Sequence, residues 1–204
     1  MPLSPDPYNL IISGIGGQGN ILLSRLVGRL MFRAGYQVSI GETFGAAQRG
    51  GGVFSGVRIS SKRLYGPIVP QGAGNMIISL EPLEALRMIS QYGNPGVKAL
   101  VNSEGIHPVA VLSQKASYPS DEAMSAAIHK ATDQAWLFNA TKIALELDAP
   151  IAVNIVMLGG LVATGALPLD ADEVADEVKA SVPPHLAELN LTAYRRGMEA
   201  VAGA

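Results

Sequence analysis

The residues best suited to chemistry in this chain are the glycines that follow its first apolar stretch. Gly14, Gly16 and Gly19 fit the pattern G-x-G-x-x-G, and Gly17 adds a further glycine to the same turn. Such a turn brings backbone N–H groups close to an anion at a helix N-terminus, where unbonded donors and the helix dipole favour negative charge. The spacing predicts a site for a phosphate or another anionic group. The alternative is that the glycines only permit a tight turn and close packing of a helix on a sheet.

A second glycine-rich segment, ETFGAAQRGGGVFSGVRIS over residues 42–60, carries a cation and an acid. Arg49 directly precedes three glycines, so its guanidinium stands beside backbone that another molecule can approach closely. The alternative is a solvated arginine in a surface loop. Glu42 follows Gly19 at about the twenty-residue spacing at which dinucleotide-binding proteins carry a ribose-binding carboxylate.

Other catalytic patterns are missing from the sequence. His107, His129 and His185 have no second ligand at metal spacing, and Ser55 lacks the first glycine of G-x-S-x-G. Asn20 stands where a phosphate-binding P-loop would continue toward its lysine. The chain contains no cysteine, so its own thiolates cannot hold an iron–sulfur cluster or act as nucleophiles. We therefore expect a binding subunit without a catalytic centre of its own.

The elements around the glycine turn follow from hydrophobic periodicity. The apolar run 10–12 predicts a buried strand, leucines four apart from residue 18 onward predict a helix, and residues 36–40 predict a second strand. Further along, alternating or short apolar runs predict strands, and capped amphipathic stretches predict helices that begin at Glu81, Ser120 and Asp170. The strands are expected at 53–59, 76–80, 98–101, 109–112 (at an edge) and 135–138, and the other helices at 139–147, 154–167 and 189–201. We expect an α/β fold: a single Rossmann-like domain over residues 1–204, with a mostly parallel sheet covered by helices.

Composition limits the classes of partner. Hydrophobic residues make up 48% of the chain and charged residues only 16%, and the mean hydropathy is +0.25. So little charge leaves apolar surface that a protein partner would cover. The 23 glycines indicate close packing, which we expect at Gly159, Gly160 and Gly165 of the most apolar helix. A formal net charge of −2 without a basic block argues against a nucleic-acid surface, and no signal peptide or membrane span is evident, so we expect a cytoplasmic protein.

Two motifs together resemble a known family. The segment GIGGQGNILLSRLVGRLMFRAGY, followed by GETFGAAQRGGGVFSGVRI, is similar to the gamma-type subunits of 2-oxoacid:ferredoxin oxidoreductases. Within that family the chain is most similar to the small (beta) subunit of indolepyruvate ferredoxin oxidoreductase. The family's G-G-Q-G, Glu-Thr and A-Q-R-G-G segments match residues 16–19, 42–43 and 47–51, and Asn154 and Leu189–Asn190 also resemble family positions.

The resemblance implies an oxidoreductase complex that decarboxylates a 2-oxoacid to an acyl-CoA and passes electrons to ferredoxin. Thiamine diphosphate and the iron–sulfur clusters would belong to a large partner subunit, in line with the absence here of cysteine and of a Gly-Asp-Gly…Asn thiamine motif. This chain would help to form the active-site region and to bind coenzyme A. The glycine backbone would hold an anionic part of the ligand, with polar contacts nearby, and the implied binding residues are Gly16, Gly17, Gln18, Gly19, Thr43, Gln48 and Arg49.

The resemblance leaves the substrate open. Phe44 and Ala46 stand where the commoner form of the motif, E-T-H-G-M-A-Q-R-G-G, has His and Met. Indolepyruvate, phenylpyruvate, phenylglyoxylate and other aryl 2-oxoacids are all candidates. Two other hypotheses are a stand-alone Rossmann-like dinucleotide-binding protein that uses Glu42 on a ribose, and a structural subunit whose Q-R-G-G-G segment contacts only protein.

Overall fold

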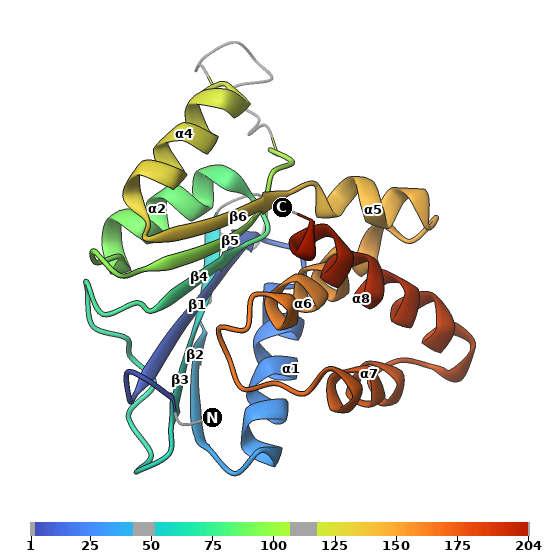
Figure 1. Cartoon of the computed structure of the whole chain (residues 1–204), viewed down its shortest axis with the longest axis horizontal. Helices are drawn as coiled ribbons and strands as arrows, with labels where there is room; N and C mark the ends of the chain where they lie inside the picture. The colour runs from blue at the N-terminus through green and yellow to red at the C-terminus, as the bar shows by residue number, and fades with distance from the viewer. Residues whose placement is uncertain (1–2, 43–51, 107–117, 204) are drawn as a thin grey trace.

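The computed structural model describes residues 3–42, 52–106 and 118–203. One six-stranded sheet forms the centre of the molecule, and helices lie on both of its faces (Figure 1). In chain order the elements are β1 (Tyr8–Ile15), α1 (Asn20–Arg33), β2 (Gln37–Glu42), β3 (Gly52–Ser60), β4 (Met76–Ser79), α2 (Pro82–Tyr92), β5 (Lys98–Asn102), α4 (Asp121–Ala131), β6 (Gln134–Phe138), α5 (Ala140–Glu146), α6 (Val153–Ala163), α7 (Ala171–Ala180) and α8 (Ala187–Ala202). Short 3₁₀ turns at Pro150–Ala152 and Pro184–Leu186 precede α6 and α8.

The strand order is β2-β3-β1-β4-β5-β6. The strands β1, β4, β5 and β6 pair in parallel, whereas β3 runs antiparallel to both β1 and β2. The mostly parallel sheet is confirmed. The glycine turn and α1 do connect β1 to β2 as predicted, but β2 is not the neighbour of β1, because β3 lies between them.

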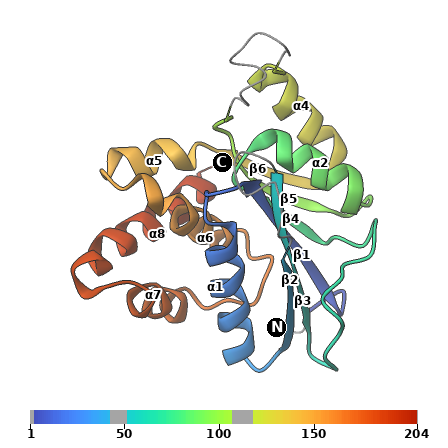
Figure 2. The ribbon, with the colours of Figure 1, turned by 180° about the vertical axis from the view of Figure 1, so that it is seen from behind.

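Two apolar cores bury the two faces of the sheet. Leu10, Ile12 and Ile78 face the larger core beneath α1, α6 and α8, whereas Ile11 and Ile77 face the smaller core beneath α2. The view from behind shows the same division, with α1 and α5–α8 on one side of the sheet and α2 and α4 on the other (Figure 2). Because both faces are covered, the central strands are apolar at successive positions rather than at alternate ones.

The predicted helix starts are confirmed by their caps. The side chains of Glu81, Ser120, Asn139 and Asp170 accept hydrogen bonds from the first turns of α2, α4, α5 and α7. The apolar helix expected at 154–167 ends earlier, at Ala163, because the chain turns at Gly165, where φ is +64°. The strand expected at 109–112 lies outside the described residues.

The most extensive helix–helix packing joins α6 to α8. A Cβ on Gly159 would lie 2.0 Å from the carbonyl oxygen of Tyr194, and a Cβ on Gly197 would lie 1.9 Å from that of Val156. The close backbone contact predicted for Gly159 is therefore confirmed. Gly160 instead packs against side chains, and Gly165 has no neighbour within 4 Å, so it serves the turn rather than the packing.

Candidate anion-binding site

The glycine turn lies at the point in the sheet where the connecting helices switch from one face to the other. The strands β1 and β4 are parallel neighbours, but the helix after β1 covers one face and the helix after β4 covers the other. In open α/β sheets, ligands bind in the crevice outside the carboxyl ends of two such strands. The fold thus places residues 16–19 at the position where a ligand is expected.

The first turn of α1 is left uncapped. Its N-cap is Gly19, in a left-handed conformation with φ 87° and ψ 21°, and no side chain caps the helix. Its first turn also contains no acidic residue, unlike the first turns of α2, α4 and α7. The N–H groups at the start of α1 and the positive end of its dipole therefore point toward the crevice without a carboxylate from their own helix.

Gln18 fixes the shape of the turn. Its Oε1 accepts a hydrogen bond from the N–H of Ile15 at 2.7 Å, and its Nε2 donates to the carbonyl of Leu80, at the end of β4, at 3.0 Å. The N–H of Gln18 also donates to the carbonyl of Ile15. A Cβ on Gly14 would lie 2.8 Å from Gln18 Oε1, so glycine at that position makes room for the Gln18 side chain.

Asn154, at the start of α6, lies directly against Gly19, the N-cap residue of α1. A Cβ on Gly19 would be 2.6 Å from Asn154 Nδ2, and the residue is only 4% exposed. Among the described residues the Asn154 side chain forms no hydrogen bond with protein, and the buried polar atoms left without a partner are those of Ser39 and Ser55, so the Asn154 amide keeps some access to solvent. Asn154 thus places a side-chain N–H donor beside the N–H groups at the start of α1.

A largely apolar pocket of about 480 Å³ opens next to Asn154. Two buried asparagines and Leu22 of α1 contribute to its wall, and Asn190 holds its own position by donating to the carbonyl of Leu186. The remaining wall comes from the turns before α6 and α8, mainly Pro150, Ile151, Leu186 and Leu189. An anion at the glycine turn would therefore have an apolar cavity beside it for the rest of a ligand.

The predicted binding residues divide into three groups. Gly16, Gly17 and Gly19 lie in the turn, with Gly17 exposed at φ 101°. Gln18 also lies there, but its side chain and its N–H are used inside the turn, so its part is to shape the site. Thr43, Gln48 and Arg49 lie outside the described residues, as does His107.

Glu42 occupies a different place from the ribose-binding position proposed for it. It ends β2, which is separated from β1 by β3, and its Oε1 lies 3.3 Å from Nε of Arg25 on α1. A carboxylate two strands from the glycine turn and paired with arginine is poorly placed for a ribose held at that turn. His129 and His185 are exposed, and across residues 3–42, 52–106 and 118–203 no group of acidic, histidine or cysteine side chains could hold a metal ion.

A buried pair of acidic side chains, which the sequence does not predict, lies at the start of α2, directly after β4. Glu81 caps α2 and also accepts a hydrogen bond from the Tyr118 hydroxyl, and Glu84 lies 2.5 Å from Nη1 of Arg87. Burial raises the pKa of Glu84, and the neighbouring charge of Glu81 raises it further, against the lowering effect of Arg87. Burial and the hydrogen bond to Glu81 raise the pKa of Tyr118 as well. The sequence Glu81-Pro82 predicts the start of this helix, but the burial of both carboxylates depends on contacts between segments far apart in the chain.

Known proteins resemble the chain over nearly its whole length. The indolepyruvate oxidoreductase subunit IorB of Pyrococcus horikoshii is 38% identical over 95% of both chains, and that of Thermococcus kodakarensis is 36% identical over the same shares. The gamma subunit of a keto/oxoacid ferredoxin oxidoreductase from Geobacter sulfurreducens superposes with a TM-score of 0.68 at 25% identity, covering 97% of this chain and 99% of that one.

A larger protein contains the same fold. The chain superposes with a TM-score of 0.72 on 31% of the 2-oxoglutarate:ferredoxin oxidoreductase of Magnetococcus marinus, at 18% identity and with 97% of this chain covered. The family model described as pyruvate ferredoxin/flavodoxin oxidoreductase matches residues 9–200. No helix in the described ranges combines the length and apolarity that crossing a bilayer requires. The chain belongs to the pyruvate ferredoxin/flavodoxin oxidoreductase family.

Proposed function

We propose that this chain is the small, gamma-type subunit of a 2-oxoacid:ferredoxin oxidoreductase complex that acts on an aryl 2-oxoacid such as indolepyruvate. Similarity to the IorB subunits over 95% of the chain supports this assignment. The chain has no cysteine, so we assign the iron–sulfur clusters, together with thiamine diphosphate, to a large partner subunit. The small subunit then contributes binding and positioning, and the complex is cytoplasmic.

The site supports a specific task within the complex, namely holding an anionic part of coenzyme A. The observation that carries this proposal is the contact between Gly19 and Asn154, which places the Asn154 amide beside the start of α1, where no side chain caps the helix. Backbone N–H groups of Gly17, Gly19 and the first turn of α1 would bind phosphate oxygens, and Asn154 Nδ2 would donate a further hydrogen bond. The apolar pocket would take a less polar part of the ligand.

The second glycine-rich segment, with the A-Q-R-G-G motif, is also part of the proposed site. Thr43, Gln48 and Arg49 would supply polar contacts to the same ligand, as the family resemblance implies. A guanidinium suits a phosphate because it offers paired N–H donors in a planar arrangement. We assign the decarboxylation to groups of the large subunit, so the residues of this chain act by binding and orienting the acyl acceptor next to the partner's catalytic centre.

The Asn154→Asp variant tests the anion site in the assembled complex. The introduced carboxylate would lie against the start of α1 and take the place of the ligand's negative charge, so the KM for coenzyme A should rise about tenfold. The kcat at saturating coenzyme A should stay within about twofold, because Asn154 has no part in the chemistry. Steady-state oxidation of indolepyruvate with ferredoxin as acceptor measures both constants.

Asn139→Asp is the matched control, because it adds the same charge at the start of another helix, α5, where aspartate also makes a good cap. This control should leave the KM for coenzyme A unchanged. An unchanged KM in Asn154→Asp as well would rule out the anion site while leaving the subunit assignment intact. Failure of the chain to assemble with any thiamine- and iron-containing large subunit would overturn the subunit assignment itself.

A further inference from the structure

A second concave surface lies on the side of α1 that faces β2, and Leu22 contributes to it as well as to the pocket beside Asn154. It is a groove of about 550 Å³ between α1 and β2, here called the α1–β2 groove. Two apolar side chains on α1 are open to solvent along it, Phe32 at 68% and Leu22 at 42% exposure. Its lining consists of Leu22, Arg25, Gly28, Arg29 and Phe32 from α1 and Val38 and Ile40 from β2.

One wall of this groove is the edge of the sheet. The strand β2 is last in the strand order and pairs with β3 alone among the described residues. A strand at an edge presents unpaired N–H and C=O groups to which a further extended segment can pair. The groove and the edge run side by side, because Val38 and Ile40 of β2 face α1.

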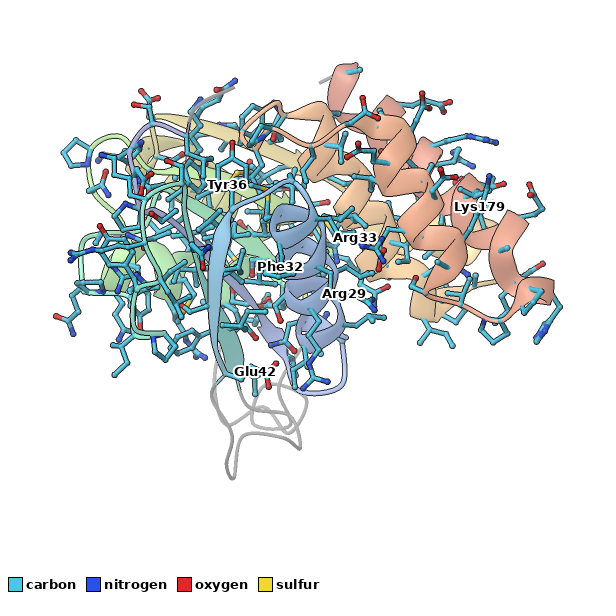
Figure 3. All side chains as sticks on the ribbon, turned by 90° about the horizontal axis from the view of Figure 1, so that it is seen from below. Arg29, Phe32, Arg33, Tyr36, Glu42 and Lys179 are labelled. Atoms are coloured by element: carbon cyan, nitrogen blue, oxygen red, sulfur yellow. The ribbon has the colours of Figure 1, made fainter. Side chains whose placement is uncertain are left out.

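Arginines of α1 lie along this groove, and each is ion-paired: Arg25 with Glu42, and Arg29 and Arg33 with Glu177. Arg25 and Arg29 are 62% and 52% exposed, and Arg33 continues the same row one turn further at 66%. The carboxylates that pair with them, Glu42 and Glu177, are only 11% and 2% exposed. Figure 3 shows Arg29 and Arg33 on the side of α1 nearer α7, with Phe32 between them and β2. An approaching molecule therefore meets guanidinium groups and apolar side chains before it meets any of these acids.

We propose that the α1–β2 groove binds an extended segment of the large partner subunit, which carries acidic and apolar side chains and adds as a strand to β2. Side chains on one face of such a strand would reach the groove at every second position, where apolar groups contact Phe32 and Leu22 and carboxylates meet Arg25 or Arg29. A second copy of this chain is the poorer occupant, because a symmetric pairing of two β2 edges would bring two sets of arginines together. The choice of the large subunit as partner rests on the proposed function.

Hydrogen–deuterium exchange on the isolated chain and on the complex tests this placement. Peptides that cover residues 37–42 should exchange at least about tenfold more slowly in the complex, since new inter-strand hydrogen bonds protect the edge amides. Peptides that cover the connection at residues 61–66, on another part of the surface, should exchange equally in both samples.

Two variants with a matched control identify the contacts. Phe32→Gln should weaken binding of the purified large subunit about tenfold, as loss of an aromatic anchor does. Arg29→Gln keeps the Arg33–Glu177 pair, and it should weaken binding and reduce the dependence of Kd on salt between about 50 and about 500 mM NaCl. Leu64→Gln, at 63% exposure outside the groove, should bind like the wild type.

The outcomes separate this inference from the proposed function. A complex that assembles and turns over normally, but leaves residues 37–42 unprotected, would refute docking in the groove and leave the proposed function standing. Protection that appears in the isolated chain as its concentration rises would identify a second copy as the occupant and refute the hetero-docking. Complete failure to bind any large subunit would refute both proposals together.

Discussion

Gln18 and Asn102 donate hydrogen bonds to the same acceptor, the carbonyl oxygen of Leu80. The distances are 3.0 Å from Gln18 Nε2 and 3.1 Å from Asn102 Nδ2. Asn102 also accepts from the N–H of Ala140 at the start of α5. One carbonyl at the end of β4 therefore joins the glycine turn after β1 to the helix that follows β6.

This shared acceptor predicts non-additive stability changes. Gln18→Met and Asn102→Leu should each lower the free energy of unfolding by about 1–3 kcal/mol, because each removes bonds to buried backbone groups. The double variant should lose about 1 kcal/mol more than the sum, since it alone leaves the Leu80 carbonyl without either donor. Urea denaturation of the four proteins measures the coupling. Strict additivity would mean that the two amides do not depend on the same carbonyl.

A second prediction concerns the crossing of α6 and α8. Gly159→Ala should destabilise the protein by about 1–3 kcal/mol or more, because its methyl group would overlap the Tyr194 carbonyl and force the two helices apart. Thermal denaturation measures the loss. Gly66→Ala is the control, because a Cβ there meets nothing within 4 Å, and it should be neutral or slightly stabilising. Equal melting temperatures for the two variants would contradict the close crossing.

The buried carboxyl of Glu84 predicts a pH dependence. Its pKa is raised in the folded state, chiefly by burial, so the folded protein binds a proton there more tightly than the unfolded chain does. Its contribution to stability is therefore complete below the unfolded pKa of 4.5 and is lost as pH rises through the folded pKa.

Glu84→Gln makes that pH dependence measurable. The variant cannot titrate at this position, so wild type should lose stability relative to it as pH rises above about 4.5. Urea titrations at several pH values between about 4.5 and 7 measure the difference in unfolding free energy. A constant difference over this range would show that Glu84 titrates like an exposed carboxyl.

The start of α7 gives a prediction about capping. Asp170 Oδ1 accepts from the N–H groups of Asp172 and Glu173, both at 3.0 Å. Asp170→Ala should therefore cost about 1 kcal/mol, whereas Asp170→Asn should cost only a few tenths because asparagine caps equally well. Chemical denaturation of both variants distinguishes hydrogen bonding from charge; similar losses in the two would assign the effect to charge.

The elements could be predicted from the sequence because their signals are local. Ser120 and Asp170 cap helices where their patterns indicate, and the apolar run at Leu10 forms β1, one of the two middle strands of the sheet. The order of the strands could not be predicted in the same way. The position of β3 between β1 and β2 depends on pairing between residues far apart in the chain, and alternation of apolar side chains does not specify the neighbour.

The candidate site could likewise be predicted only where its signal is local. The glycine spacing identifies the turn, because G-x-G-x-x-G has a local structural reason. Nothing around Asn154 indicates from the residues alone that its amide lies against Gly19, since that contact depends on how α6 packs beside α1. The family resemblance implies that Gln18 contacts a ligand, and its hydrogen bonds to Ile15 and Leu80 add a structural part that the sequence does not predict.

The interposed strand β3 has a consequence for how such a subunit can change over generations. It sets the outer edge of β2 about 10 Å from β1, the distance of two strand spacings. Substitutions along that edge can accumulate without reshaping the glycine turn, and substitutions at the turn need not alter the edge. A lineage can thus change what pairs with β2 through this edge while it keeps its ligand, whereas changes on the α1 side of the groove, such as at Leu22, also reach the pocket beside the turn.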